Sequence, residues 1–285
     1  HYSFLVMTET QNVATYARIR PYNPAINEDK TQTARCLDGD KVLNKNGDNE
    51  DTYNFTKVFA DADTTEDVFN KGMLPLLKYK ILNGITSIFI VYGQSGSGKS
   101  FTLIGEPGHL GVLPMSLNYL LDQTDKVSKI EVSSIEAYGV KSTKINFFDL
   151  VKQWNAKQKD KKGFDPWNSP ADPRVTPKNA QSIAITKDNC LQIITELQEV
   201  SHMAPTLKNP HSSRGHTVYF CRVVMRELED TYFIAVDLAG SEGQTALGTQ
   251  DEFVEGLKLA MAKGKLNLGA KAMKNIVQMY KTRSL

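Results

Sequence analysis

A glycine-rich turn that ends in Lys99-Ser100 is the stretch of this chain whose residue types point most directly to chemistry. Residues 93–100 read Gly-Gln-Ser-Gly-Ser-Gly-Lys-Ser and match the P-loop pattern. Its glycines let successive backbone N–H groups turn toward one anion, the lysine adds a full charge, and the serine hydroxyl is placed to ligate Mg²⁺. The apolar run Ile88–Tyr92 before the turn favours a buried strand that carries a phosphate-binding loop over a chance glycine-rich turn.

Two later stretches carry groups that suit the same site. Residues 209–216 read Asn-Pro-His-Ser-Ser-Arg-Gly-His, and two hydroxyls beside an arginine could complete a Mg²⁺–phosphate shell, although a solvated polar turn is the ordinary reading. Asp237 closes the apolar run Phe233–Val236, which is where P-loop enzymes place a carboxylate near Mg²⁺. Gly240 would let a backbone N–H approach a γ-phosphate. The three stretches together predict a nucleotide site.

The elements that must position these loops alternate between strand and helix patterns. Strands are predicted by alternation or by apolar runs, at 13–21, 88–92, 130–138, 145–150, 218–224 and 232–236. Helices are predicted after Thr64 or Thr65, with a kink or stop at Pro75, after Ser100, and after Asp188. Residues 152–179 look like a mobile surface excursion, and residues 27–51 like a hairpin that turns at 46–48. The pattern predicts a three-layer α/β domain with a central mixed, mostly parallel sheet flanked by helices.

Composition sets further limits on function. A formal net charge of +2 gives no global attraction to nucleic acid or membrane, and no basic patch interleaved with aromatic residues supports nucleic-acid binding. The cysteines Cys36, Cys190 and Cys221 lack metal-ligand or redox spacing, so they are predicted to be small buried side chains in a reducing compartment. No apolar run reaches membrane-spanning length and the N-terminus does not read as a signal peptide, which predicts a soluble, cytoplasmic protein.

The motif set resembles that of the kinesin motor domain. Residues 93–100 are similar to the family's Gly-Gln-Thr-Gly-Ser-Gly-Lys-Thr loop, residues 209–216 to its first switch, Asn-x-x-Ser-Ser-Arg-Ser-His, and residues 237–242 to its second switch, Asp-Leu-Ala-Gly-Ser-Glu. Residues 18–21 resemble its Arg-x-Arg-Pro, and 136–139 its Glu-Ile-Tyr-Asn strand. The resemblance implies a motor domain over residues 13–285, an N-terminal extension over 1–12, and a last strand, last helix and neck that lie beyond these residues.

The resemblance also implies a role for each residue of the motifs. Ser100 and Ser213 would ligate Mg²⁺, with Asp237 holding it through water, while Lys99 and the Gly240 amide would contact the outer phosphates of ATP or ADP. Arg214 and Glu242 would form the salt bridge that closes the switches around ATP, and Arg18 and Pro21 would border the adenine. The full catalytic set is Asn209, Ser212, Ser213, Arg214, Gly240 and Glu242. The full cofactor-binding set is Arg18, Arg20, Pro21, Gly93, Gln94, Ser95, Gly96, Ser97, Gly98, Lys99, Ser100 and Phe101.

Several departures from the family pattern keep an alternative open. Ser95 and Ser100 replace threonines but retain a hydroxyl, and Phe101 stands where an aromatic residue or His is usual. Gly215 replaces a serine and Ser201 an arginine, which is compatible with a kinesin-like microtubule-binding module that has weak or no ATPase activity. A switch GTPase is disfavoured because the chain has no Asn-Lys-x-Asp stretch for reading guanine.

The stretch 253–280 carries an apolar stripe at helical spacing and, on a different face, the residues Lys263, Asn267, Lys271 and Lys274. A solvated lysine face would account for the second stripe. The resemblance implies instead that this helix contacts the acidic surface of tubulin. The expected function is therefore an ATP-hydrolysing microtubule motor located on the cytoskeleton, on microtubules or the spindle.

Overall fold

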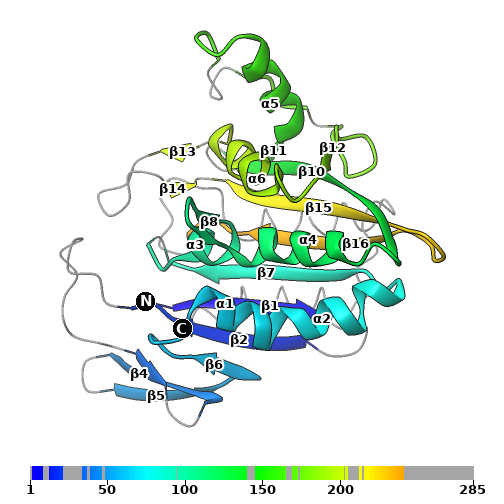
Figure 1. Ribbon diagram of the computed structural model, residues 1–285. Coiled ribbons are helices and arrows are strands. Elements are labelled where there is room, and N and C mark those ends of the chain that lie inside the picture. Colours follow the sequence, from blue (N-terminus) through cyan, green and yellow to red (C-terminus); the bar gives the residue numbers. More distant parts are fainter. Residues whose placement is uncertain are drawn as a thin grey trace.

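A mixed β-sheet forms the centre of the molecule in a computed structural model (Figure 1), which describes residues 2–8, 13–21, 34–36, 39–46, 49–94, 96–139, 145–164, 169–172, 174–201, 203–204, 212–213 and 215–240. From one edge to the other, its strands are β11 (Ile145–Asp149), β10 (Val127–Gly139), β15 (His216–Met225), β16 (Thr231–Asp237), β7 (Ser87–Gly93), β1 (Tyr2–Thr8), β2 (Val13–Ile19) and β6 (Lys57–Phe59). Strand β12 (Ile183–Ile185) pairs with β10 beside this order.

Strand directions confirm that the sheet is mixed, but fewer of its strand pairs are parallel than predicted. Only β7 with β16 and β2 with β6 pair in parallel among the described strands, whereas the other neighbours are antiparallel. The prediction of a mostly parallel sheet is therefore wrong. A short connection forces its two strands to run antiparallel, and β15 is joined to β16 by residues 226–230 alone.

Strand β1 lies inside the sheet. It pairs antiparallel with β2, from Tyr2 opposite Ile19 to Thr8 opposite Val13, and with β7, from Ser3 opposite Gly93 to Met7 opposite Phe89. Residues 2–8 thus join the strand before the P-loop to β2. The domain boundary at residue 13 stays a prediction, and residues 2–8, which precede it, form an internal strand of this sheet.

The segment before the P-loop strand is helical but not regular. Thr64 caps α1 (Thr65–Val68) in a capping box, since its side chain accepts a hydrogen bond from the Asp67 amide while the Asp67 carboxylate accepts one from the Thr64 amide. A π-helical segment, η2 (Phe69–Met73), then leads into α2 (Leu74–Tyr79) and a 3₁₀ turn, η3 (Ile81–Asn83). Pro75 falls in the first turn of α2, where its missing N–H is tolerated, so the predicted irregularity at Pro75 is confirmed.

The remaining helices follow the P-loop. Helix α3 (Lys99–Leu103) is separated from α4 (Val112–Asp122) by the small hairpin of β8 (Gly105–Glu106) and β9 (His109–Leu110). Helix α6 (Cys190–Glu199) begins after Asn189 rather than after Asp188.

Helix α5 (Leu150–Lys159) lies in the stretch that composition assigned to a surface excursion. It forms because Asp149 caps it and because Leu150 and Val151 are buried. The indole Nε1 of Trp154 also donates to Glu196 on α6 at 2.6 Å.

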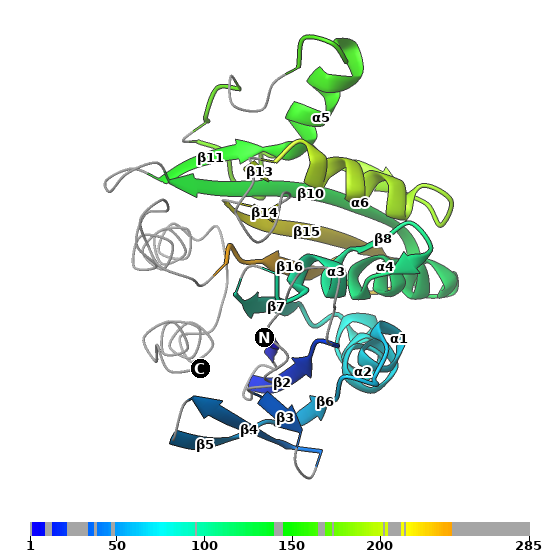
Figure 2. The same ribbon diagram turned by 90° about the vertical axis from the view of Figure 1, so that its left-hand side faces the viewer.

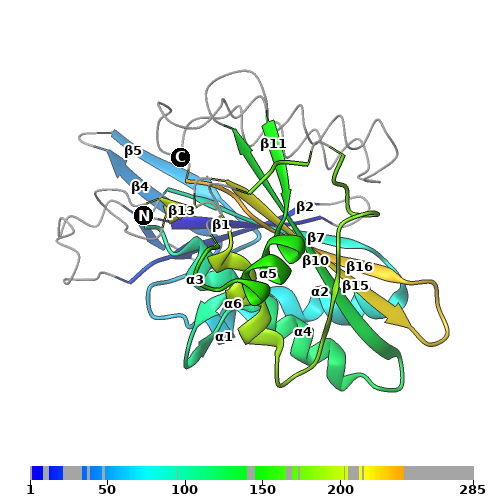
Figure 3. The same cartoon turned by 90° about the horizontal axis from the view of Figure 1, so that it is seen from above.

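Hydrophobic cores cover both faces of the sheet. Helices α1, α2, α4 and α6 lie along one face (Figures 1 and 3), over a large core that includes Phe89 and Val91 of β7. Ile88 and Ile90, which alternate with them, belong to a second core on the opposite face. The predicted buried strand at residues 88–92 is confirmed, and both of its faces are covered.

Smaller sheets border this body. One consists of β3 (Ala34–Cys36), β4 (Lys41–Asn46) and β5 (Asn49–Asn54), which lie near β2 and β6 (Figure 2) and include the predicted hairpin. Another pairs β13 (Met203–Ala204) with β14 (Ser212–Ser213), and a third is the β8–β9 hairpin. None of the helices in the described ranges has the length and apolarity that crossing a membrane requires.

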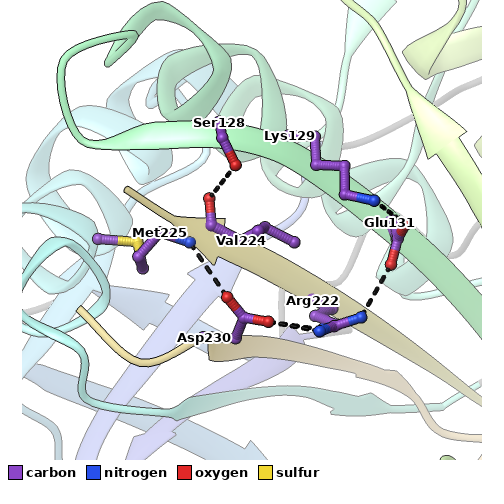
Figure 4. Close-up of polar contacts among 7 residues, drawn as sticks. All are labelled: Ser128, Lys129, Glu131, Arg222, Val224, Met225 and Asp230. Carbon is purple, nitrogen blue, oxygen red and sulfur yellow. Dashed lines mark hydrogen bonds and ion pairs between the residues drawn. The ribbon is translucent and has the colours of Figure 1, made fainter. Parts of the chain in front are cut away.

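A cluster of charged and polar side chains lies near the Met225 end of β15, which is the end away from the P-loop (Figure 4). Arg222 on β15 reaches Glu131 on β10 at 3.2 Å and Asp230 in the β15–β16 connection at 2.5 Å. The Asp230 carboxylate also accepts a hydrogen bond from the Met225 amide. These contacts fasten the tight connection that sets the antiparallel direction of β15 and β16.

Candidate nucleotide-binding site

The P-loop leaves β7 at Gly93 and enters α3 at Lys99. Gly98 adopts a φ of +88°, which favours glycine, and a Cβ there would lie 3.5 Å from Cδ of Arg20. The Lys99 ammonium donates to the carbonyl oxygens of Gly93 and Gln94, each at 2.9 Å. Lys99 is 7% exposed, so a buried positive charge lies within the curve of the loop.

Asp237 joins the end of β16 to the P-loop helix. It lies opposite Val91 in the parallel pair of β16 and β7, and its Oδ2 accepts a hydrogen bond from the Ser100 hydroxyl at 2.7 Å. Burial raises the pKa of the Asp237 carboxyl, while the Lys99 charge and the Ser100 hydrogen bond act in the opposite direction. Its other oxygen, Oδ1, is buried without a hydrogen-bond partner among the described residues.

These oxygens fit the ion that the resemblance implies. Mg²⁺ takes oxygen ligands and is usually held by one or two protein groups together with phosphate oxygens and water. The Ser100 hydroxyl and the unpartnered Asp237 oxygen offer this type of ligand beside a lysine placed for phosphate. No group of three or more His, Cys, Asp or Glu side chains suited to a metal occurs in the described ranges.

Arg18 and Phe101 come together next to the loop. The Arg18 guanidinium donates to the Thr102 hydroxyl at 2.8 Å and lies over the Phe101 ring, 5.9 Å from its centroid. Burial lowers the pKa of Arg18, and the nearby Asp63 carboxylate partly offsets this. Phe101 is 40% exposed, so its ring remains accessible to a planar group such as a base.

Gly215 packs directly against a buried carboxylate. Gly215 precedes β15, and a Cβ at this position would lie 2.5 Å from Oε1 and 2.7 Å from Cγ of Glu136, a fully buried residue of β10. The close contact with Glu136 therefore explains why this chain has glycine where the family has serine.

Replacing Gly215 with serine should destabilise the protein through this contact. We expect Gly215→Ser to cost about 1–3 kcal/mol of unfolding free energy, as overpacking of a buried site usually does. Urea denaturation of wild type, Gly215→Ser, Glu136→Ala and the double variant measures this as a double-mutant cycle. The serine should cost at least about 1 kcal/mol less when residue 136 is alanine. Equal costs in both backgrounds would show that Glu136 moves aside freely.

His216 ties the start of β15 to the residues after β16. Its Nδ1 accepts a hydrogen bond from the Ala239 amide at 3.2 Å, which requires a neutral imidazole. Burial and the Lys99 charge lower the pKa of His216 from 6.5 to about 4. The contact is therefore present at neutral pH.

This shift predicts an acid-dependent loss of stability. Because the folded pKa is depressed, the unfolded chain takes up a proton between about pH 6.5 and pH 4 while the folded chain does not. The stabilisation is complete above pH 6.5 and falls by on the order of 2–3 kcal/mol as pH drops to 4. Urea denaturation at pH 7.5 and 4.5 should show a smaller loss in His216→Asn, whose side-chain oxygen can still accept the Ala239 hydrogen bond. Identical losses in both proteins would mean that other groups cause the acid sensitivity.

The structure brings together part of the predicted site. Within the described chain, Gly93, Lys99, Ser100 and Asp237 meet at one end of the parallel pair, with Arg18 and Phe101 beside them. Gly96 and Ser97 complete the loop, while Pro21 is exposed next to Arg20. Ser212 and Ser213 lie on β14, and Gly240 follows β16. Outside the described residues lie Ser95, Asn209, Arg214, Glu242, Lys263, Asn267, Lys271 and Lys274.

Sequence reasoning missed three contacts of this site. Thr102 holds Arg18, His216 receives the Ala239 amide, and Glu136 backs Gly215. The spacing of Thr102 behind the P-loop lysine gave no signal of its own. Glu136 could have been flagged, because it follows a run of small and apolar residues at 132–135, and an acidic residue buried in a strand needs a partner.

Similarity to known proteins agrees with the motifs. The kinesin motor domain family matches residues 18–277. Kinesin-related protein 13 of Dictyostelium discoideum is 28% identical over 262 residues, covering 86% of this chain and 20% of that protein. Kinesin-like protein Klp61F of Drosophila melanogaster is 27% identical over 284 residues, with coverages of 84% and 24%. Human centromere-associated protein E is 27% identical over 259 residues, with coverages of 85% and 9%.

Among solved structures, KIF14 residues 391–755 with ADP in complex with a microtubule has a TM-score of 0.59 at 22% identity, and the match covers 79% of this chain and 68% of that one. This likeness shows the fold. The chain spans less than a quarter of the length of the three curated relatives named above. Since the family match extends over most of the residues, this chain belongs to the kinesin motor domain family.

Proposed function

We propose that this chain is an ATP-hydrolysing microtubule motor domain, in which binding and hydrolysis of Mg²⁺-ATP are coupled to microtubule binding and movement. The observation that carries the proposal is the hydrogen bond between Ser100 of the P-loop helix and Asp237 at the end of β16. It places the group expected to ligate the metal directly against the segment that leads into the second switch.

The residues of the site suit positioning and charge stabilisation rather than covalent catalysis. Lys99 would exchange its loop carbonyl partners for phosphate oxygens, and Arg18 with Phe101 would border the base. Ser100 and Asp237, with Ser213, would hold Mg²⁺, which when bound neutralises charge on the outer phosphates. Arg214 and Glu242 would close the switches and orient water.

Microtubules are the proposed partner. The solved neighbour was determined with ADP on a microtubule, and the relatives are kinesins. In this chain the contact would be made by the stripe Lys263, Asn267, Lys271 and Lys274, and the protein would act on microtubules or the spindle. Nucleic acid is not proposed as a partner.

Phosphate release from ATP, with and without microtubules, tests the proposal. We expect ATP turnover that rises several-fold with microtubules, little turnover of GTP, and tighter cosedimentation with a non-hydrolysable ATP analogue than with ADP. Lys99→Ala is the matched inactive control, since it removes the phosphate-facing charge. A complete motor domain that releases no phosphate at any microtubule concentration would contradict the proposal.

A second candidate is a microtubule-binding module that hydrolyses ATP weakly. The departures at Gly215 and Ser201 are the observations that favour it, although the packing of Gly215 on Glu136 gives the first of them a structural reason. Cosedimentation that is independent of the nucleotide, together with absent phosphate release, would favour this module over the motor.

A further inference from the structure

Two buried hydroxyl groups lie on β15 and β10, the two strands that follow β16 in the sheet. The Tyr219 hydroxyl on β15 and the Ser134 hydroxyl on β10 belong to fully buried residues, and neither has a hydrogen-bond partner in the part of the chain that the structure describes. Asp237 Oδ1 is also buried without a hydrogen-bond partner among the described residues. Native proteins rarely bury polar atoms in this way without a partner or an ordered water. These three groups therefore call for a physical explanation.

The strand register places these groups on one face. Ser134 lies opposite Tyr219, and Tyr219 lies opposite Ala235, whereas Thr217 lies opposite Asp237. Directly opposed residues share a face of a sheet, and so do residues two positions apart along a strand. Tyr219 and Asp237 therefore project from the same face of neighbouring strands, one pleat apart. The methyl group of Ala235, opposite Tyr219, offers no competing hydrogen bond.

The charges around Tyr219 agree with this placement. Burial raises the pKa of the Tyr219 hydroxyl well above its ordinary value, and the carboxylates of Asp237 and Glu136 raise it further. The hydroxyl is thus within electrostatic reach of Asp237 and remains protonated. A protonated hydroxyl can donate, and an ionised carboxylate oxygen can only accept, so the two groups are complementary. A buried water, which typically makes about three hydrogen bonds, is the usual bridge between such groups.

We propose that Tyr219 is a positioning residue for Asp237, whose hydroxyl donates through a buried water to the carboxylate oxygen that Ser100 does not occupy. This contact would fix the orientation in which Asp237 faces Mg²⁺, and it would give the buried Oδ1 a donor. The inference rests on the proposed function, because it assigns the bridge to the Mg²⁺ that accompanies the nucleotide.

The test is the Mg²⁺ dependence of ADP affinity in Tyr219→Phe. This change removes one oxygen and keeps the ring. A fluorescent ADP analogue is titrated at a series of Mg²⁺ concentrations and in EDTA. We expect the Mg²⁺ concentration that gives half of the gain in ADP affinity to rise about threefold to tenfold. This is less than the 10- to 100-fold loss typical of a group that supports a metal ligand directly. Affinity in EDTA should stay within about twofold of wild type, because the P-loop is unchanged.

Tyr232→Phe is the matched control. It removes the same atom from an exposed tyrosine at the far end of the neighbouring strand, and its Mg²⁺ dependence should equal that of wild type. Thermal melting of the ADP-free proteins gives a second readout. Tyr219→Phe should melt at or below the wild-type temperature if the hydroxyl is bridged, whereas removal of an unsatisfied hydroxyl would raise it.

The possible failures are distinguishable. An unchanged Mg²⁺ dependence in Tyr219→Phe overturns this inference alone, and a raised melting temperature in the same variant overturns it as well. If wild-type protein shows no Mg²⁺-dependent nucleotide binding, the proposed function falls and this inference falls with it.

Discussion

Deleting residues 1–10 should abolish the folded state of this domain. Strand β1 lies between β7 and β2, and in the described sheet it is the only strand that joins them. Its removal would leave backbone groups of both neighbours without partners at once, including those of the buried Val91 and Ala17. Unpaired buried backbone groups cost about 1–3 kcal/mol each, and a domain is stable by only about 5–15 kcal/mol. We expect no cooperative melting transition and no nucleotide binding.

A single substitution tests the same strand more gently. Leu5 pairs with Tyr16 on one side and Val91 on the other, so Leu5→Pro removes one ladder donor from the middle of a central strand. Leu5→Ala keeps the backbone and serves as the control. Circular dichroism melting should show a loss of about 3 kcal/mol or more for proline beyond that of alanine. A truncated protein that still melts cooperatively would show that another segment pairs with β7 and β2.

The site could be predicted from sequence where its signals are local. The P-loop spacing, the apolar strand before it and the acidic residue after Phe233–Val236 each occupy a few consecutive residues. Ser100 and Asp237, which two of these signals mark, form a hydrogen bond in the structure. The helix start at Thr64 could be predicted for the same reason, because its capping box involves only the four residues Thr64–Asp67.

Contacts between residues that are far apart in the chain could not be predicted from the sequence. Arg18 and Thr102 are 84 residues apart, and nothing near either one signals the other. The place of β1 depends on two neighbours far along the chain, and a short apolar segment carries no mark of its partner. Strand direction depends on how the chain returns to the sheet, so the apolar runs identified β7 and β16 but overstated the parallel share.

Asp237→Asn should weaken the Mg²⁺-dependent affinity for nucleotide while stabilising the nucleotide-free protein. The amide keeps the shape of the carboxylate and an oxygen that can accept from Ser100, but it removes the charge that attracts the metal. Losses of about 10- to 100-fold in metal affinity are usual when a group that supports a metal site is replaced. The Mg²⁺ titration with a fluorescent ADP analogue measures this, and affinity in EDTA should change little.

The gain in stability follows from the burial of Asp237, which is 3% exposed and has one oxygen without a partner among the described residues. Because its pKa is raised in the folded state, the ionised carboxylate opposes folding at neutral pH, and this cost disappears as pH falls through the folded pKa toward the ordinary value of 3.8. Asp237→Asn should therefore melt higher than wild type at pH 7, by about 1–3 kcal/mol of unfolding free energy, with the difference shrinking near pH 4. A variant that melts lower at pH 7 and binds Mg²⁺-ADP normally would make Asp237 a structural residue. A buried carboxylate kept at a cost to stability is expected only where its charge is used, and in this chain the use would be the metal that the nucleotide brings.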